Sequence, residues 1–306
     1  MTSTITTTQR PLLGASILLT TAIIWSFFGI LVRLLGYNIP FFYGGLVRNL
    51  AAALILSGIL WYSKQYKPMT RHDLWWAIAR TTIGMMSMVG NFAGFVYLPM
   101  GTAYFINFGG SIIGGFLLGR VLFGERLTPL KIISLVIAFI GMTMVYQVSF
   151  NPELVKYMII IFLSGIAGSF WTISAKKISH DYSAVQLNAL DTAIFSVLAF
   201  GLSLIQREVW VLPSLTIPWL ANLLFLVMII VTGQLIILGY KHIDAQRGSL
   251  IMLLEIVLGT ILGAIFFHES LGILAIIGGA LIITAAALPE VSELMKSRSA
   301  NKTASL

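Results

Sequence analysis

The sequence contains no cysteine and unusually few charged residues. Without cysteine, the chain can form no disulfide, no thiolate nucleophile and no cysteine-ligated metal site. Charged residues make up only 10% of the 306 residues, whereas a soluble domain normally carries about 25%. Hydrophobic residues reach 58%, so most of the outer surface must face lipid rather than water. The sequence therefore predicts an integral membrane protein.

Motifs of soluble catalysis are missing as well. The chain has no phosphate-binding Gly-Lys-Ser/Thr loop, no His-Glu-x-x-His zinc motif and no Gly-x-Ser-x-Gly nucleophile turn. We therefore expect no enzyme activity, no cofactor and no metal site. The formal net charge of +8 would suggest nucleic acid in a soluble protein. Here the basic residues follow the expected membrane topology, so we expect no nucleic-acid partner.

Ten apolar stretches are long enough to cross a bilayer as helices, which requires about 20 mostly apolar residues. They are rich in Gly, Ala and Ser, as packed membrane helices are, and lack the alternation of barrel strands. The stretches are Leu12–Leu35, Pro40–Tyr62, Leu74–Tyr97, Thr102–Phe123, Leu130–Gln147, Tyr157–Ala175, Ala184–Ile205, Trp219–Gly239, Ser249–Phe267 and Gly272–Leu288. We therefore predict an all-α membrane protein with ten transmembrane helices.

Lys and Arg gather in alternate connections between these stretches. When the N-terminal tail is counted as cytoplasmic, 14 of the 19 Lys and Arg residues fall on the cytoplasmic side. The loops of the opposite side hold only Lys156 and Arg207, while Arg33 lies near the outer end of the first stretch. The positive-inside rule therefore predicts cytoplasmic termini, in what we expect to be a bacterial inner membrane.

Two segments of the chain match at a constant offset. The matched residues, each pair 144 positions apart, are Gly115 with Gly259, Gly119 with Gly263, Glu125 with Glu269 and Leu127 with Leu271; Arg33 and Lys176 are 143 apart. A repeat of five helices places the second copy upside down in the membrane, as in secondary transporters with a site between the halves. We predict repeats at residues 1–147 and 157–289, a connecting loop at 148–156 and a cytoplasmic tail at 290–306.

These motifs resemble those of a known family. The resemblance is carried, in chain order, by Trp25, Arg48, the run Phe123–Thr128 and its repeat Phe267–Leu271. Together they resemble EamA-type members of the drug/metabolite transporter superfamily. Leu254 and Glu255 match the start of that family's Leu-Glu-Pro motif, but Ile256 stands in place of the proline. The resemblance implies export or exchange of small metabolites, often amino acids.

Four charged residues lie within the expected spans: Arg48, Arg80, Asp191 and Glu255. A charge near the bilayer centre costs at least ~2.5–3.5 kcal/mol on insertion scales, so it usually faces a cavity or a partner. Glu255 either binds a substrate ammonium group or a proton, or makes structural hydrogen bonds. Arg80 and Asp191 lie at similar depth, which favours a structural ion pair. Arg48 either holds a substrate carboxylate or extends to the outer interface.

Polar and aromatic residues within the spans form a candidate cavity lining. The candidates are Glu255, Asn91, Tyr104, Asn107, Ser111, Trp171, Gln234 and Trp25. Any one polar residue of this kind is more often a helix-to-helix hydrogen bond than a ligand, but as a group they suit a cavity lining. The glycines Gly115, Gly119, Gly259 and Gly263 have the small-x-x-x-small spacing of close helix packing, which we favour over substrate contact.

The sequence therefore predicts a secondary transporter that carries a small molecule across the bilayer by alternating access, as a monomer or weak oligomer. Amino acids or related metabolites are the favoured cargo, since a cavity with Glu255 suits a zwitterion, and proton coupling through this residue is an option. The alternatives are cationic drugs, nucleotide-linked sugars or S-adenosylmethionine, and an intramembrane lipid-handling enzyme. Sparse intramembrane basic residues argue against nucleotide-linked sugars, and the absence of paired carboxylates argues against catalysis.

Overall fold

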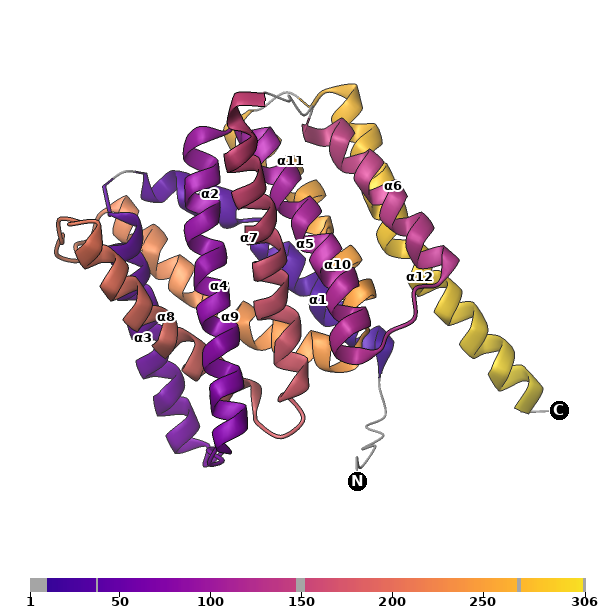
Figure 1. Ribbon diagram of the computed structural model, residues 1–306, viewed down its shortest axis with the longest axis horizontal. Helices are drawn as coiled ribbons and strands as arrows, with labels where there is room; N and C mark the ends of the chain where they lie inside the picture. The colour runs from indigo at the N-terminus through magenta and orange to yellow at the C-terminus, as the bar shows by residue number, and fades with distance from the viewer. Residues whose placement is uncertain (1–9, 37, 147–151, 269–270, 305–306) are drawn as a thin grey trace.

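The computed structural model describes residues 10–36, 38–146, 152–268 and 271–304, and every regular element in these ranges is a helix. Figure 1 shows them as a bundle of long helices. The helices of the first half are α1 (Pro11–Trp25), α2 (Phe28–Leu35), α3 (Phe41–Tyr62), α4 (Arg71–Tyr97), α5 (Met100–Phe123) and α6 (Pro129–Tyr146). Those of the second half are α7 (Val155–Ser174), α8 (Ala184–Ile205), α9 (Ile217–His242), α10 (Ala245–Met252), α11 (Leu254–Phe267) and α12 (Ile273–Ala304), with short 3-10 turns at Pro152–Leu154 and Ala175–Lys177.

Nine spans within the described residues are long and apolar enough to cross a membrane, with α1–α2 and α10–α11 each counted as one. The tenth helix, α4, is longer than each of these nine spans but is also more polar. Its 27 residues correspond to about 40 Å at 1.5 Å per residue, and it crosses the whole bundle beside α7 (Figure 1). Polar residues such as Arg80 and Thr81 lower its hydropathy but are buried inside the protein. The predicted all-α membrane fold is confirmed.

Helix packing follows the two inverted repeats. The repeat relates α1–α2 to α7, α3 to α8, α4 to α9, α5 to α10–α11 and α6 to α12. Under this exchange the packed pair α4–α7 becomes the packed pair α1–α9. The pairs α3–α8 and α6–α12 each map onto themselves and are also packed together. The interface between the halves therefore has the pseudo-twofold pattern of inverted repeats, as predicted.

The two ends of the bundle are distinguished by the connections that they carry. The termini side, at the lower edge of Figure 1, holds the start of α1 and the connections α3–α4, α5–α6, α7–α8 and α9–α10. The opposite side holds the connections α2–α3, α4–α5 and α8–α9. Successive spans thus run in alternate directions, as the loop charges predict.

Two spans expected as continuous helices are divided in the structure. The first breaks at Ser26 and Phe27, where the Ser26 hydroxyl donates to the carbonyl of Ile23 at 2.6 Å and competes with the helix ladder. The other breaks at Leu253, whose N–H bonds to Leu250 three residues back, at 3.2 Å. The span is therefore divided here although Ile256 stands in place of the family's proline. At the other end of the chain, α12 continues past the expected span to Ala304.

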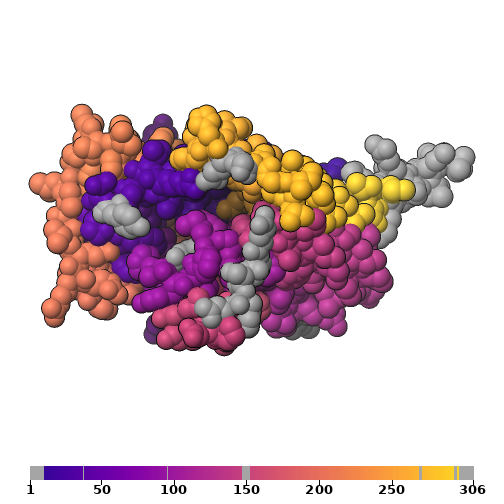
Figure 2. Space-filling view, turned by 90° about the horizontal axis from the view of Figure 1, so that it is seen from above, coloured from indigo at the N-terminus to yellow at the C-terminus, as the bar shows by residue number. Residues whose placement is uncertain are grey.

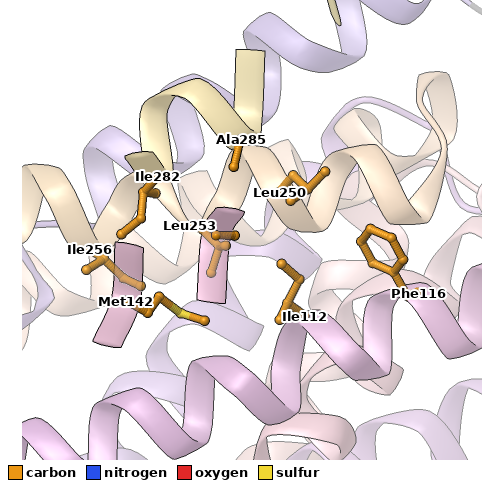
Figure 3. Close-up of a cluster of buried hydrophobic side chains, with 9 residues drawn as sticks. Ile112, Phe116, Met142, Leu250, Leu253, Ile256, Ile282 and Ala285 are labelled. Carbon is orange, nitrogen blue, oxygen red and sulfur yellow. The ribbon is translucent and has the colours of Figure 1, made fainter. Parts of the chain in front are cut away.

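A cluster of buried apolar side chains joins the two repeats where α5 and α6 meet α10, α11 and α12. Figure 3 shows Ile112 and Phe116 of α5 facing Leu250 and Leu253 across this interface. Leu253 is 2% exposed, although it lies at the helix break. Because lipid is as apolar as these side chains, close packing rather than exclusion of water stabilises such a contact. The cluster holds the broken span in position.

Candidate functional site

The helices α5 and α7 form a seam in which the two backbones touch. A methyl group added at Gly165 of α7 would overlap the carbonyl oxygen of Asn107, and one at Gly110 of α5 would overlap the carbonyl oxygen of Phe162. Only residues without a side chain allow so close an approach. We call this contact the tight seam, and it leaves no room for a ligand between the backbones at these points.

Two of the predicted cavity residues, Asn107 and Ser111, belong to the tight seam, and a third, Asn91, contacts it from α4. The Asn107 side-chain amide donates to Asn91 Oδ1 of α4 at 2.5 Å. Ser111 accepts at its carbonyl a hydrogen bond of 2.5 Å from the hydroxyl of Ser169 on α7. These polar groups therefore form hydrogen bonds between neighbouring helices. This is the alternative to cavity lining that the sequence analysis left open.

The repeat-related seam, between α1–α2 and α10–α11, is packed differently along its length. On the termini side, α10 is buried at every residue from Ala245 to Ile251. Farther along, Ile256 is the one buried residue of α11, and Leu31 is the one buried residue of α2. In the end-on view of Figure 2, the indigo α1–α2 segment lies between the orange and golden segments of the second repeat. We call this contact the split seam, because it is closed on the termini side and loosely packed toward the opposite side.

Glu255 lies at the point where the split seam loosens, in the first turn of α11. Its side chain is half-buried, and within the described residues it has no hydrogen bond or ion pair. The phenols of Tyr104 and Tyr146 are within electrostatic reach of its carboxylate, and Arg33 also acts on Tyr104. Tyr104 stacks on Tyr146 with ring centroids 6.0 Å apart. The structure thus gathers an acid and two phenols at one place in the bundle, with the Arg33 guanidinium within electrostatic reach of one of the phenols.

Trp25 ends α1 next to the same break. Its indole nitrogen is buried and has no hydrogen-bond partner among the residues that the structure describes. A buried donor without a partner usually signals a missing ligand, water or alternative arrangement. Of the predicted lining residues, Glu255, Tyr104 and Trp25 are therefore the three associated with the split seam.

Glu125 closes the termini side of the split seam. Its carboxylate accepts the backbone N–H groups of Ala245 at 2.7 Å and Gln246 at 3.2 Å, which cap the start of α10. A negative charge at a helix N-terminus is favourable. Lys176 bonds to the same carboxylate at 3.5 Å and to the carbonyl of Ile243 at 2.9 Å. This group of contacts ties α5, α7 and α10 together.

Each side of the bundle has a cation–aromatic contact at repeat-related positions. On the termini side, the Lys176 ammonium lies 5.0 Å from the ring centroid of Phe123. On the opposite side, the Arg33 guanidinium lies 4.2 Å from the ring centroid of Phe267. Glu269, the repeat counterpart of Glu125, lies outside the described residues. Lys176 and Arg33 were not among the predicted site residues, although their spacing of 143 residues was a signal that could have found them.

Arg80 of α4 and Asp191 of α8 form a buried ion pair, with 2.5 Å between Nη1 and Oδ1. Thr81 donates to the same carboxylate oxygen at 2.6 Å, and the Trp171 indole bonds to the other at 3.3 Å. Arg80 also donates to the carbonyl of Trp171 from Nε and Nη2. Trp171, a predicted lining residue, is therefore held in a network that joins α4, α7 and α8.

Gln234, Arg48 and the matched glycines are the remaining candidates. Gln234 donates to the carbonyl of Ile230 in its own helix at 3.3 Å. Arg48 is 5% exposed and so does not reach an interface. The matched glycines differ between the repeats. A methyl group at Gly115 would collide with Ser249, and one at Gly119 would collide with Glu125. At Gly259 the nearest atom to an added methyl group would be 3.8 Å away. Gly263 is half-buried.

Comparisons with known proteins agree with this architecture. A family model described as the EamA-like transporter family matches residues 12–147 and again residues 155–289. No curated protein matches the chain with significance. Among 29 matching chains of solved structures, one described only as "Crystal structure of protein" is 18% identical, with a TM-score of 0.77. That match covers 90% of this chain and 97% of the other and shows a shared fold. With both halves matched over most of its length, the chain belongs to the EamA-like transporter family of the drug/metabolite transporter superfamily.

Proposed function

We propose that this transporter moves a small zwitterionic metabolite, with amino acids as the favoured class, by alternating access between its two repeats. The observation that carries the proposal is the difference between two repeat-related seams. One is closed along its length, while the other is closed only on the termini side. A transporter that exposes its site to one side at a time must break its internal symmetry in this way.

The termini side is, in this proposal, the cytoplasmic side of a bacterial inner membrane, in keeping with its excess of Lys and Arg. The contacts of Glu125 and Lys176 with the start of α10 then form the inner gate in its closed state. The Arg33–Phe267 contact marks the corresponding place at the outer end. Export or exchange would require the inner gate to release α10 while the outer half of the split seam closes.

Glu255 is the proposed contact for a substrate ammonium group. It is half-buried, has no ionic partner among the described residues and lies near two phenols, whose rings also favour a cation. Arg33 supplies positive charge toward the outer end of the same seam, which suits a substrate that also carries a carboxylate. A proton could compete with the ammonium group for Glu255, and this competition would couple transport to pH. Cationic drugs remain the second candidate class, because they need the carboxylate of Glu255 but not the guanidinium of Arg33.

The absence of native cysteine allows a direct test of alternating access. Thr260→Cys in α11 and Ser249→Cys in α10 place single thiols in the outer and inner halves of the split seam. We expect an impermeant thiol reagent added outside to label Thr260→Cys, and substrate to lower that labelling. Labelling of Ser249→Cys from the inside should rise under the same conditions. Val209→Cys and Lys64→Cys, in loops of opposite sides, serve as controls of sidedness.

Two results would contradict the proposal. If labelling of both seam positions is unaffected by any substrate in a metabolite panel, the seam does not alternate. If Val209→Cys and Lys64→Cys react from the same side of the membrane, the ten-span topology is wrong.

A further inference from the structure

Asp244 stands at the N-cap of α10 but does not cap it. Its backbone is extended, as at most N-cap positions, and its carbonyl accepts the N–H of Gly248 at 2.9 Å, the first bond of the helix. Asp is among the best capping residues, because its carboxylate normally accepts an N–H of the first turn. Within the described residues, however, the Asp244 side chain makes no such bond. A strong capping residue is therefore in place but unused.

The capping role is filled from another helix. Glu125, which follows α5, accepts the N–H groups of Ala245 and Gln246 at 2.7 and 3.2 Å. Its side chain is 7% exposed, so it brings its negative charge to the start of α10 out of contact with water. Glu125 belongs to the first repeat and α10 to the second. Opening of the inner gate would therefore take this cap away from α10.

The Asp244 carboxylate is turned toward a third helix instead. Its Oδ2 lies 3.2 Å from Nζ of Lys131, in the first turn of α6. The Lys131 side chain is 10% exposed and that of Asp244 is 32% exposed, so water screens the pair only in part. Lys131 also donates to the carbonyl of Arg126 at 3.4 Å. Because Lys131 belongs to the first repeat, this ion pair joins the two repeats across the inner gate.

The ion pair has no charged equivalent at the outer end of the bundle. At the repeat offset of 143 or 144 residues, Asp244 corresponds to Gly101 or Met100, and at 144 Lys131 corresponds to Ala275. None of these residues carries a charge, so the repeat does not provide a second pair of this kind. The pair therefore distinguishes the two gates and favours the form in which the inner one is closed.

We propose that Asp244 exchanges partners when the inner gate opens. The exchange rests on the alternating access proposed above. In the closed gate, Glu125 caps α10 while Asp244 pairs with Lys131. In the open gate, Glu125 and Lys131 have moved away with the first repeat, and the Asp244 carboxylate caps α10 itself. The start of α10 then keeps a capping group in both forms, which lowers the free-energy cost of opening. Asp244 is thus a positioning residue for the gate helix, and Lys131 holds the gate closed.

The test measures how often the inner gate opens without substrate. In inside-out membrane vesicles, an impermeant reagent labels Ser249→Cys, the sole thiol, at a rate that reports the open population. Lys131→Met and Asp244→Asn both break the ion pair but leave a capping group at position 244, since Asn caps as well as Asp. We expect each to raise the labelling rate roughly threefold. Lys177→Gln, which removes a basic residue that contacts the Trp76 ring, is the control and should leave the rate unchanged.

Asp244→Ala separates the two roles of the carboxylate. It breaks the ion pair and also removes the cap from the open form, so its labelling rate should lie roughly fivefold below that of Asp244→Asn. The closed form makes no use of this cap. The melting temperatures of the two purified variants should therefore differ little, whereas a purely structural cap would make Asp244→Ala clearly the less stable.

Three results would overturn the exchange. Equal labelling of Asp244→Asn and Asp244→Ala would mean that Asp244 does not cap the open form. Parental labelling in both Lys131→Met and Asp244→Asn would mean that the ion pair does not hold the gate. An Asp244→Ala variant that fails to fold, or melts far below Asp244→Asn, would mean that the cap is already in use in the closed form.

These failures are distinct from a failure of the proposed function. Each of them can occur while substrate still changes the labelling of Ser249→Cys, and then only the exchange of partners is wrong. If Ser249→Cys stays unlabelled from the inside in every variant, with and without substrate, α10 does not open. That result would refute both the exchange and the alternating access on which it rests.

Discussion

The tight seam between α5 and α7 and the split seam between α1–α2 and α10–α11 are related by the internal repeat but have different structures. In the tight seam, both helices are continuous, and glycines bring their backbones into contact. In the split seam, both spans are broken, and the halves beyond the breaks are largely half-exposed. The comparison shows that two related sequences in one chain can form the same helix contact in two ways. One contact is closed, and the other is partly open.

Polar residues have different partners in the two seams. Asn107 and Ser111 are satisfied by bonds to neighbouring helices, so their expected contribution is to stability. Glu255 has no such partner among the described residues, so its expected contribution is to transport. The following three predictions use this difference, beginning with the largest effect.

Glu255→Gln should sharply reduce transport while leaving the fold intact. A hydrogen bond to a charged group contributes about 1.5–3 kcal/mol, and 1.4 kcal/mol corresponds to about tenfold in affinity. We therefore expect the KM for a zwitterionic substrate to rise roughly tenfold or more, with little change in melting temperature. Uptake into proteoliposomes is the measurement, and Asp181→Asn in an exposed loop is the control. Wild-type transport by Glu255→Gln on both sides of neutral pH would remove this residue from the mechanism.

Gly115→Ala and Gly259→Ala form a repeat-matched pair with unequal expected effects. At Gly115 the new methyl group would collide with Ser249, so α5 and α10 must move apart, at a cost of about 1–3 kcal/mol. At Gly259 the nearest atom is the carbonyl oxygen of Ser26 at 3.8 Å. There the better helix propensity of alanine, up to about 1 kcal/mol, should leave stability unchanged or improved.

Thermal unfolding of both glycine variants in the same lipid measures this difference. Equal destabilisation at the two positions would mean that the split seam is as closely packed as its counterpart, and the comparison would fail.

Ser169→Ala should lower the stability of the protein only slightly, and the matched control Thr260→Val should leave it unchanged. The Ser169 hydroxyl bonds across to the carbonyl of Ser111, and such bonds between membrane helices average about 0.6 kcal/mol. Thr260→Val removes a hydroxyl that donates only to Ile256 in its own helix, at 2.8 Å. Unfolding measurements should therefore order the variants as wild type, Thr260→Val and then Ser169→Ala. A larger loss for Thr260→Val would indicate that its hydroxyl has a role in the split seam that the structure does not show.

Sequence reasoning reached the architecture but not the division of the candidate residues. Asn107 and Glu255 are both polar residues in apolar helices, and nothing in their neighbours distinguishes a helix-to-helix bond from an open position. The same holds for the charges. Arg48 and Arg80 look alike along the chain, yet one has Asp191 at 2.5 Å and the other has an amide and an aromatic ring. Partners that are 111 and 174 residues away cannot be read from local spacing.

The sequence by itself determined the helical spans, their alternating direction and the family. These follow from local properties, because in lipid every backbone group must be bonded within its own helix and the flanking charges orient each span. The tertiary structure decided where Ser26 and Leu253 interrupt their helices, and that Glu125 holds α10 through its N-terminus. It also decided which of two equivalent seams is closed. A repeated sequence is compatible with either choice, and only the packing of all the helices together selects one.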